Sequence, residues 1–340
     1  MAQTKKITVT PITSGAVLEP TEAEEKLLAA YGEVYGQTVR EVYKRCVIGT
    51  EPWFVKGEKA LRSELIARGW SQREANSIYG TAQAAQDSAV EALKLALVSA
   101  REELLKVSKK LTKAPTERRH GLARRRARLK SRISSWEQRL KDDQVRVCFG
   151  SRRVLRATRE WEKNGYATQD EAHQVWTRRR GGMIYVEGDK QCLSGNASLR
   201  LELSETGDAL KLRVPPFLRH HSGGDEWVTI ALQGISSKQG RGELEAAITR
   251  DPRVQARRIA EWEAKRRELP QAGSGQKEGP KISKNPPEQT CAGPVSVRLS
   301  WREDKGAWYL GASVAREAST PLPGRWKALI GVDVNPNHLA

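Results

Sequence analysis

The stretch "ASLRLELSETGDALKLRV", residues 197–214, carries the strand pattern that decides the fold. Apolar and polar residues alternate on both sides of a turn at Thr206-Gly207-Asp208. Successive side chains of a strand point to opposite faces of a sheet, so each run presents one apolar face. The apolar residues are Leu199, Leu201 and Leu203 before the turn and Leu210, Leu212 and Val214 after it. The pattern predicts an antiparallel hairpin with one buried face.

Other segments repeat this two-residue period. "EWVTIALQG", residues 226–234, predicts one strand, and "VSVRLSWREDKGAWYLGASV", residues 295–314, predicts a second hairpin with its turn at Asp304 to Gly306. Near the start of the chain, Ile7 and Val9 predict a short strand that Pro11 ends. Strands at this spacing favour a small antiparallel barrel or sandwich, which the first strand would complete.

Between the first strand and residue 143 the pattern is helical. Apolar residues recur alternately three and four apart, at Val90, Leu93, Leu97, Ala100, Leu104, Val107 and Leu111. A second run has the same repeat, at Leu122, Leu129, Ile133, Trp136 and Leu140, with Arg126 where an apolar residue is due. Pro115 breaks the first helix, and Thr116 is placed to cap the second. Residues 84–142 therefore read as an antiparallel helical hairpin.

Two segments interrupt the strands. Residues 241–269 are charged and predicted to be helical. Residues 270–290 are rich in Pro, Gly, Ser and Lys and have almost nothing to bury, so they predict a mobile loop.

The charge of the chain is strongly basic. Lys and Arg number 59 against 41 Asp and Glu, a net charge of +18, which is typical of proteins whose partner is a polyanion. The excess gathers in "RRHGLARRRARLKSR", residues 118–132, which contains no acidic residue. Its basic residues are Arg118, Arg119, Arg124, Arg125, Arg126, Arg128, Lys130 and Arg132. Like charges four apart on a helix repel by about 0.2–0.5 kcal/mol per pair, and a phosphate backbone would offset that cost.

The same charge recurs downstream, at Arg152, Arg153, Arg156 and Arg159 and again at Arg178, Arg179 and Arg180. The glycines that follow Arg180 suit either a close approach of two backbones or a plain turn. A helical hairpin with only a structural role, or a basic protein that is merely soluble, would also account for parts of this pattern.

No apolar run approaches the roughly 18 residues that a membrane span needs, and the first residues lack the apolar core of a signal peptide. We therefore expect a cytoplasmic protein with no membrane partner. The sequence does not indicate an oligomeric state.

No complete catalytic motif is readable: there is no phosphate-binding loop, no nucleophile elbow and no H-E-x-x-H helix. His220 and His221 are adjacent, which favours a surface or RNA-contacting loop over a metal site. The remaining candidate is Asp333, which follows the apolar run of residues 328–332. A residue of this kind also caps many turns.

The stretch around Asp333, "IGVDVNPNHLA", resembles the first catalytic motif of the RuvC nuclease domain in TnpB proteins, which are transposon-encoded relatives of type V CRISPR effectors. Residues 148–203, from "CFGSRRVLRATREW" to "SLRLEL", are similar to the segment that precedes RuvC in the longer TnpB-related proteins. The order of the predicted parts also fits that family. The resemblance is most specific over residues 130–215 and 326–340 and least specific over the first 80.

The resemblance implies an α+β fold. A helical recognition lobe with the antiparallel hairpin would be inserted into a small antiparallel β-barrel, the wedge, which is similar to oligonucleotide-binding folds. The first strand of an RNase H-like domain, incomplete here, would follow. The implied boundaries are 1–15 for the first wedge strand, 16–145 for the recognition lobe, 146–322 for the barrel with its insertion 241–269 and loop 270–290, and 323–340 for the start of RuvC.

In that family the lobe and the barrel hold a guide RNA and its heteroduplex with target DNA, and RuvC cuts DNA as a metal-dependent endonuclease. Asp333 would be the first of the carboxylates that bind Mg²⁺. The family's later acidic motifs and cysteine pairs would lie beyond residue 340, so we expect these residues alone not to cut DNA. The alternatives are a nuclease-inactive, RNA-guided repressor or adaptor that binds DNA, and a structural nucleic-acid-binding protein without a guide.

Overall fold

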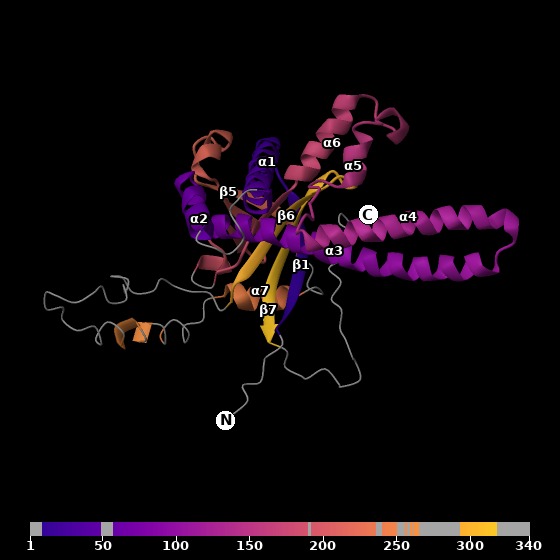
Figure 1. Ribbon diagram of the computed structural model, residues 1–340. Helices are drawn as coiled ribbons and strands as arrows, with labels where there is room; N and C mark the ends of the chain where they lie inside the picture. Colours follow the sequence, from indigo (N-terminus) through magenta and orange to yellow (C-terminus); the bar gives the residue numbers. More distant parts are fainter. Residues whose placement is uncertain are drawn as a thin grey trace.

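The structure is a computed structural model that describes residues 9–48, 57–189, 192–235, 240–249 and 293–317, with a few more between 256 and 264. It has an α+β fold in which helices pack against an antiparallel sheet (Figure 1). The expected mixture of helices and antiparallel strands is thus confirmed. The expected start of RuvC and the loop 270–290 lie outside the described residues.

The sheet has seven strands in the order β2-β6-β7-β1-β5-β4-β3, and every neighbouring pair is antiparallel. The strands are β1 (Val9–Glu19), β2 (Met183–Val186), β3 (Leu199–Glu202), β4 (Asp208–Arg213), β5 (Trp227–Gln233), β6 (Val295–Arg302) and β7 (Ala307–Glu317). In the β3–β4 hairpin Leu199 is opposite Leu212 and Leu201 opposite Leu210, and all four side chains are buried. Both predicted hairpins and the predicted strand at β5 are confirmed.

The first strand differs from the prediction. Pro11 does not end it: β1 runs from Val9 to Glu19, and Pro11 pairs with Ala315 of β7 inside the ladder. Proline lacks an N–H, so it fits a strand only where one edge needs no donor. Here β5 pairs only with Val17 to Glu19, which leaves that edge of β1 without a ladder at Pro11 among the described residues. The expected boundary between residues 15 and 16 falls within this strand.

The sheet is open in its hydrogen bonding, because no ladder joins β2 to β3 in the described part of the chain. A side chain joins these edges instead. The fully buried Asn196 donates from Nδ2 to the carbonyls of Val186 in β2 (3.1 Å) and Val295 in β6 (2.9 Å). Its Oδ1 accepts from the backbone N–H groups of Ser198 (3.0 Å) and Leu199 (2.9 Å) at the start of β3. We call this arrangement the Asn196 clasp.

The helices lie mainly in the first half of the chain. They are α1 (Glu22–Tyr43), α2 (Gly57–Ala67), α3 (Gln72–Lys113), α4 (Thr116–Lys141), α5 (Arg152–Ala157), α6 (Gln169–Gly181) and α7 (Arg241–Ile248), with a π-helical turn Lys44–Ile48 and 3₁₀ turns at Glu162–Asn164, Leu193–Gly195 and Pro216–Ser222. Thr21 with Glu24, and Ser71 with Glu74, form capping boxes that fix the starts of α1 and α3.

One hydrophobic core joins the sheet to α1 and the first turns of α3. Tyr31 of α1 donates to the buried Glu74 of α3, and Tyr35 donates to the carbonyl of Tyr185 in β2 at 2.8 Å. Burial, followed by the charge of Glu74, raises the pKa of Tyr31 well above its ordinary value. Both phenols therefore remain neutral donors that tie α1 to its neighbours.

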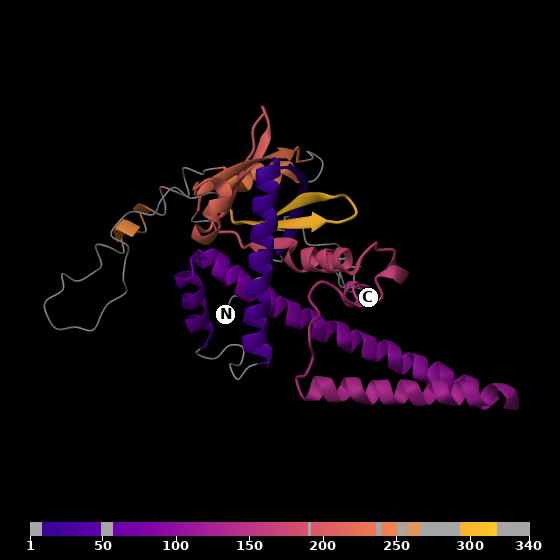
Figure 2. The same ribbon diagram turned by 90° about the horizontal axis from the view of Figure 1, so that it is seen from above.

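The predicted helical hairpin is confirmed as α3 and α4, which project from the rest of the molecule as an arm (Figures 1 and 2). Leu97, Ala100 and Ile133 form a small core of the arm, separate from the main one. Arg126 is half-buried on the predicted seam. Thr116 does not cap α4: the cap position belongs to Pro115, whose φ of −64° suits a helix start but which offers no side-chain hydrogen bond.

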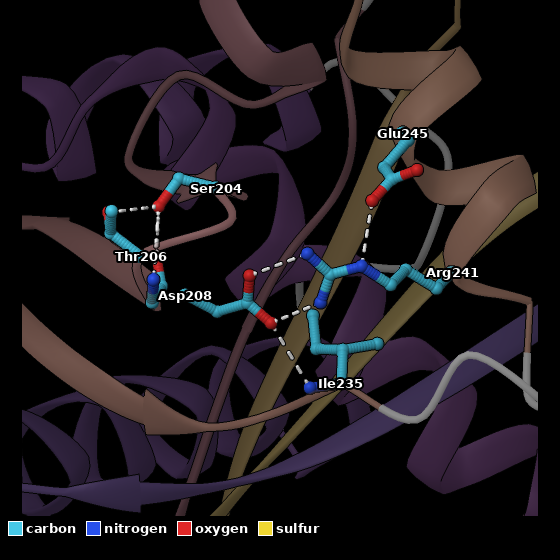
Figure 3. A network of polar contacts seen from close by, with 7 residues as sticks. Ser204, Thr206, Asp208, Ile235, Arg241 and Glu245 are labelled. Carbon is cyan, nitrogen blue, oxygen red and sulfur yellow. Dashed lines mark hydrogen bonds and ion pairs between the residues drawn. The ribbon is translucent and has the colours of Figure 1, made fainter.

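Helix α7 covers the first eight residues of the predicted insertion and is tied to the sheet by a salt bridge (Figure 3). Arg241 donates to both carboxylate oxygens of Asp208, at 2.5 and 3.0 Å, and its Nε donates to Glu245 at 2.7 Å. Asp208 also accepts from the backbone N–H of Ile235. Burial on its own would raise the pKa of Asp208, but these hydrogen bonds outweigh it and hold that pKa below its ordinary value.

Candidate nucleic-acid interface

At about 100° per residue, one side of α4 carries Arg118, Arg124, Arg125, Arg128 and Arg132, and the other side carries Arg119, Arg126 and Lys130. We call these eight residues together the α4 basic row. All are exposed except the half-buried Arg126. Arg125 binds Glu103 of α3 at 2.5 Å, Arg119 donates to the carbonyl of Ala114 at 2.9 Å, and Arg132 lies over the ring of Trp136. Within the described residues, seven of the eight have no carboxylate partner.

The length of this row suits a nucleic-acid backbone. Arg118 and Arg132 are 14 residues apart, which at 1.5 Å per residue is about 21 Å of helix. Phosphates follow one another every 3.4 Å along the axis of each DNA strand, so such a length faces about six of them. The charge is carried by a straight element with little to shield it, which is suited to binding phosphates rather than reading base edges.

A second group, the α6 triplet Arg178, Arg179 and Arg180, occupies the last turn of α6. Glycines fix its place, because α1 crosses the end of α6 at very short range. A Cβ on Gly32 would lie 2.1 Å from the carbonyl oxygen of Gly181, and one on Gly36 would lie 2.3 Å from that of Arg180. A Cβ on Gly181 would likewise lie 2.7 Å from Cα of Glu33, so this glycine serves the close approach of two backbones, one of the two interpretations that the sequence allowed.

Hydrogen bonding and stacking then orient the triplet. Arg40 of α1 donates to the carbonyl of Arg180 at 2.9 Å. The guanidinium of Arg180 lies 4.2 Å from the ring centre of Trp176, and that of Arg178 lies 5.8 Å from the ring centre of Trp301. Stacked guanidinium groups keep their N–H edges available for anions. In the part of the chain that the structure describes, no carboxylate pairs with any of the three.

A third group lies around α5. Arg146, Arg152, Arg156 and Arg159 line a hollow of about 330 Å³ together with Val147, Cys148 and Leu155; we call it the arginine hollow. Arg153, also expected to bind, is exposed outside it. Sequence reasoning missed Arg146, although its place between the apolar Val145 and Val147 in "QVRVCF" is a strand-like pattern with one outward cation.

The arginine hollow and the α6 triplet are neighbours. Gly150 has a φ of +84°, and a Cβ there would lie 2.6 Å from Cγ of Arg180 and 3.3 Å from the ring of Trp176. Only glycine adopts this conformation without strain and also leaves room for Arg180. The turn into α5 therefore packs on the end of α6, and the two arginine groups lie on neighbouring elements.

Of the metal-site and catalytic candidates in the sequence, only His220 and His221 lie among the described residues. Within them, no three His, Cys, Asp or Glu side chains are grouped to hold a metal ion. His220 and His221 lie on the 3₁₀ turn Pro216–Ser222 with ring centres 4.1 Å apart, so they do not diverge as adjacent residues of a strand would. Asp333 lies outside the described residues.

Searched over the described residues, the chain has no helix that is both long and apolar enough to cross a membrane. Comparison of the sequence with protein-family models and with curated proteins finds no match.

Proposed function

We propose that this chain binds nucleic acid, as the part of a TnpB-like RNA-guided DNA endonuclease that holds the guide RNA and the target DNA. The observation that carries the proposal is the α4 basic row: seven exposed or half-buried cations without a carboxylate partner among the described residues, on a projecting arm. Repulsion between these cations lowers the stability of the free protein, and bound phosphates offset that repulsion.

The three basic groups support a division of work. The arm offers the five basic residues on one side of α4 to the backbone of a duplex, which is recognised by its shape and its phosphates. The hollow and the α6 triplet lie on the main body beside the sheet, and we propose that this sheet is the wedge. The Asn196 clasp would then join β2 to β3 where a closed barrel has its last ladder of hydrogen bonds. In this proposal Asp333 belongs to the nuclease domain that binds Mg²⁺, and no binding step depends on it.

The first test measures the affinity for an RNA duplex against salt concentration. Each phosphate contact contributes about −0.9 to the slope of log K against log salt, so Arg124→Glu with Arg128→Glu is expected to reduce the slope by about two and to weaken binding. Both residues are exposed and neither has an ion pair among the described residues, so the fold should survive. Lys44→Glu with Lys59→Glu, at the end of α1 and on α2, is the matched control with the same change of net charge, because both lysines are exposed and neither has an ion pair among the described residues.

If the control pair weakens binding as much as the arm pair, binding follows net charge alone and the α4 basic row has no special role. The guide is tested separately, by sequencing the RNA that co-purifies with the chain. One dominant RNA species supports the TnpB-like proposal. A random mixture of RNA, released equally by salt, contradicts it and favours a structural nucleic-acid-binding protein.

A further inference from the structure

The arginine hollow differs from the other basic groups because its residues line a shared, partly open hollow on the surface. Four arginines line a space of about 330 Å³ together with Val147, Leu155 and Cys148. Ligand pockets in proteins begin at about 300 Å³, so the hollow suits one small group rather than an extended strand. Its chemistry combines anion binding at the rim with apolar contact.

The hollow is built on a fixed frame. The backbone N–H of Val147 donates to the hydroxyl of Tyr43 at 2.9 Å, and the neighbouring Phe149 meets the ring of Tyr43 edge-on at 5.2 Å. On α5, Val154 is buried, and Arg152 and Arg156 are one turn apart on the exposed face. The main core therefore holds the chain at Val147 and Phe149, and the buried Val154 anchors α5.

The charge of the hollow is not balanced within the protein. None of its four arginines forms an ion pair among the residues described, although Glu160 and Glu162 follow closely in the sequence. Arginine presents a planar fork of donors that matches phosphate oxygens two at a time. Four arginines beside an apolar surface offer donors for the phosphate of a nucleotide and an apolar contact for its base.

We propose that the arginine hollow binds one nucleotide of a single-stranded stretch of nucleic acid, with its phosphate among the arginines and its base against Val147 and Leu155. This inference rests on the proposed function and deepens it. The arm holds the duplex, and the hollow holds an unpaired nucleotide next to it. A base can enter the hollow only when it is not paired, because pairing keeps it inside the helix.

Cys148 lines the hollow and serves as its reporter. The rate of its alkylation by iodoacetamide near neutral pH is measured by mass spectrometry of its own peptide, with and without nucleic acid. Cys192 is an internal control, because burial, and then the charge of Asp189, raise the pKa of its thiol to about 11. A short single-stranded RNA at about ten times its Kd is expected to slow alkylation of Cys148 about tenfold. A blunt duplex at the same occupancy should leave it almost unchanged.

Two variants link the protection to the arginines. Arg152→Glu with Arg156→Glu is expected to weaken single-strand binding at least about tenfold and to remove the protection, while the affinity for a blunt duplex changes far less. Arg152→Lys with Arg156→Lys keeps the charge but loses the planar fork, so it should restore only part of the protection. Circular dichroism checks that both variants stay folded.

The outcomes separate the two proposals. If the chain binds RNA and Cys148 is never protected, or if a duplex protects it as well as a single strand, the inference is overturned while the proposed function stands. If the chain binds no nucleic acid but adenosine monophosphate protects Cys148, the proposed function fails and the hollow is a site for free nucleotides, which also overturns the inference. Protection by single strands alone, lost in the Glu variant, supports it.

Discussion

Replacement of Asn196 by alanine should be among the most damaging single changes in the sheet. The side chain has no exposed surface and makes four hydrogen bonds, all of them to backbone groups, which uses two donors and two acceptor positions. The variant leaves two carbonyls and two N–H groups buried without that partner.

The magnitude follows from these four groups. A typical hydrogen bond contributes about 0.5–1.5 kcal/mol net, and a buried group left unpaired costs about 1–3 kcal/mol. Water that enters the space of the lost side chain recovers part of this. We therefore expect Asn196→Ala to lower the free energy of unfolding by about 3–5 kcal/mol, a large part of the 5–15 kcal/mol that is usual for a domain.

Urea unfolding followed by circular dichroism measures this change. Asn164→Ala is the matched control: its amide donates to the carbonyl of Glu160 at 2.7 Å, but the residue is exposed, so the expected cost is below about 1 kcal/mol. If both variants lose the same stability, or if Asn196→Ala costs less than about 1 kcal/mol, the two edges of the sheet are held together by something other than the clasp.

Two further predictions concern the packing of α6 and α7. Gly36→Ala should lower the free energy of unfolding by about 1–3 kcal/mol in thermal or urea unfolding, because its Cβ would meet the carbonyl of Arg180. Gly80→Ala is the control and should be neutral or stabilising, because its Cβ meets nothing within 4 Å. Equal losses of stability in the two variants would contradict this prediction. Asp208→Asn should cost about 1–3 kcal/mol above pH 5. The pKa of Asp208 is lower in the folded state than in the unfolded state, where it is near 3.9. The stabilisation by the ionised carboxylate is therefore present above the unfolded-state pKa and is lost as the pH falls through the folded-state pKa. The gap between wild type and variant in urea titrations should therefore close below about pH 4, and a gap that stays constant to lower pH would be evidence against a charged Asp208.

Sequence reasoning succeeded where the signal is local and periodic. The alternation around residues 199–214 and the heptad pattern on α3 and α4 each place an apolar face without knowledge of the partner. It failed where neighbours distant in the sequence decide the outcome. Pro11 could be kept inside a strand only because β5 stops short of it. The four residues of β2 were missed because they are too few to show a period and acquire their pairing from β6.

The candidate interface shows the same contrast. Runs of arginine in the sequence predicted the α4 basic row and the α6 triplet. Their surroundings were not predictable. Arg146 lines the hollow although it lies outside the runs of arginine, and the α6 triplet packs against Gly32 and Gly36 of α1. Charge composition predicts a polyanionic partner, and only the fold shows which cations lie close together.

The arm has a mechanical consequence. Helix α3 is continuous over 42 residues, about 63 Å at 1.5 Å per residue, and passes without a break from the main core to the tip of the arm. Its first turn is clamped by the Ser71 cap and by Tyr31 on Glu74. A lever of this kind has no hinge along its length. A force applied at the tip is therefore carried by the rod to its clamped end, where the hydroxyl of Ser71 lies 3.2 Å from that of Ser198, a residue that the Asn196 clasp holds.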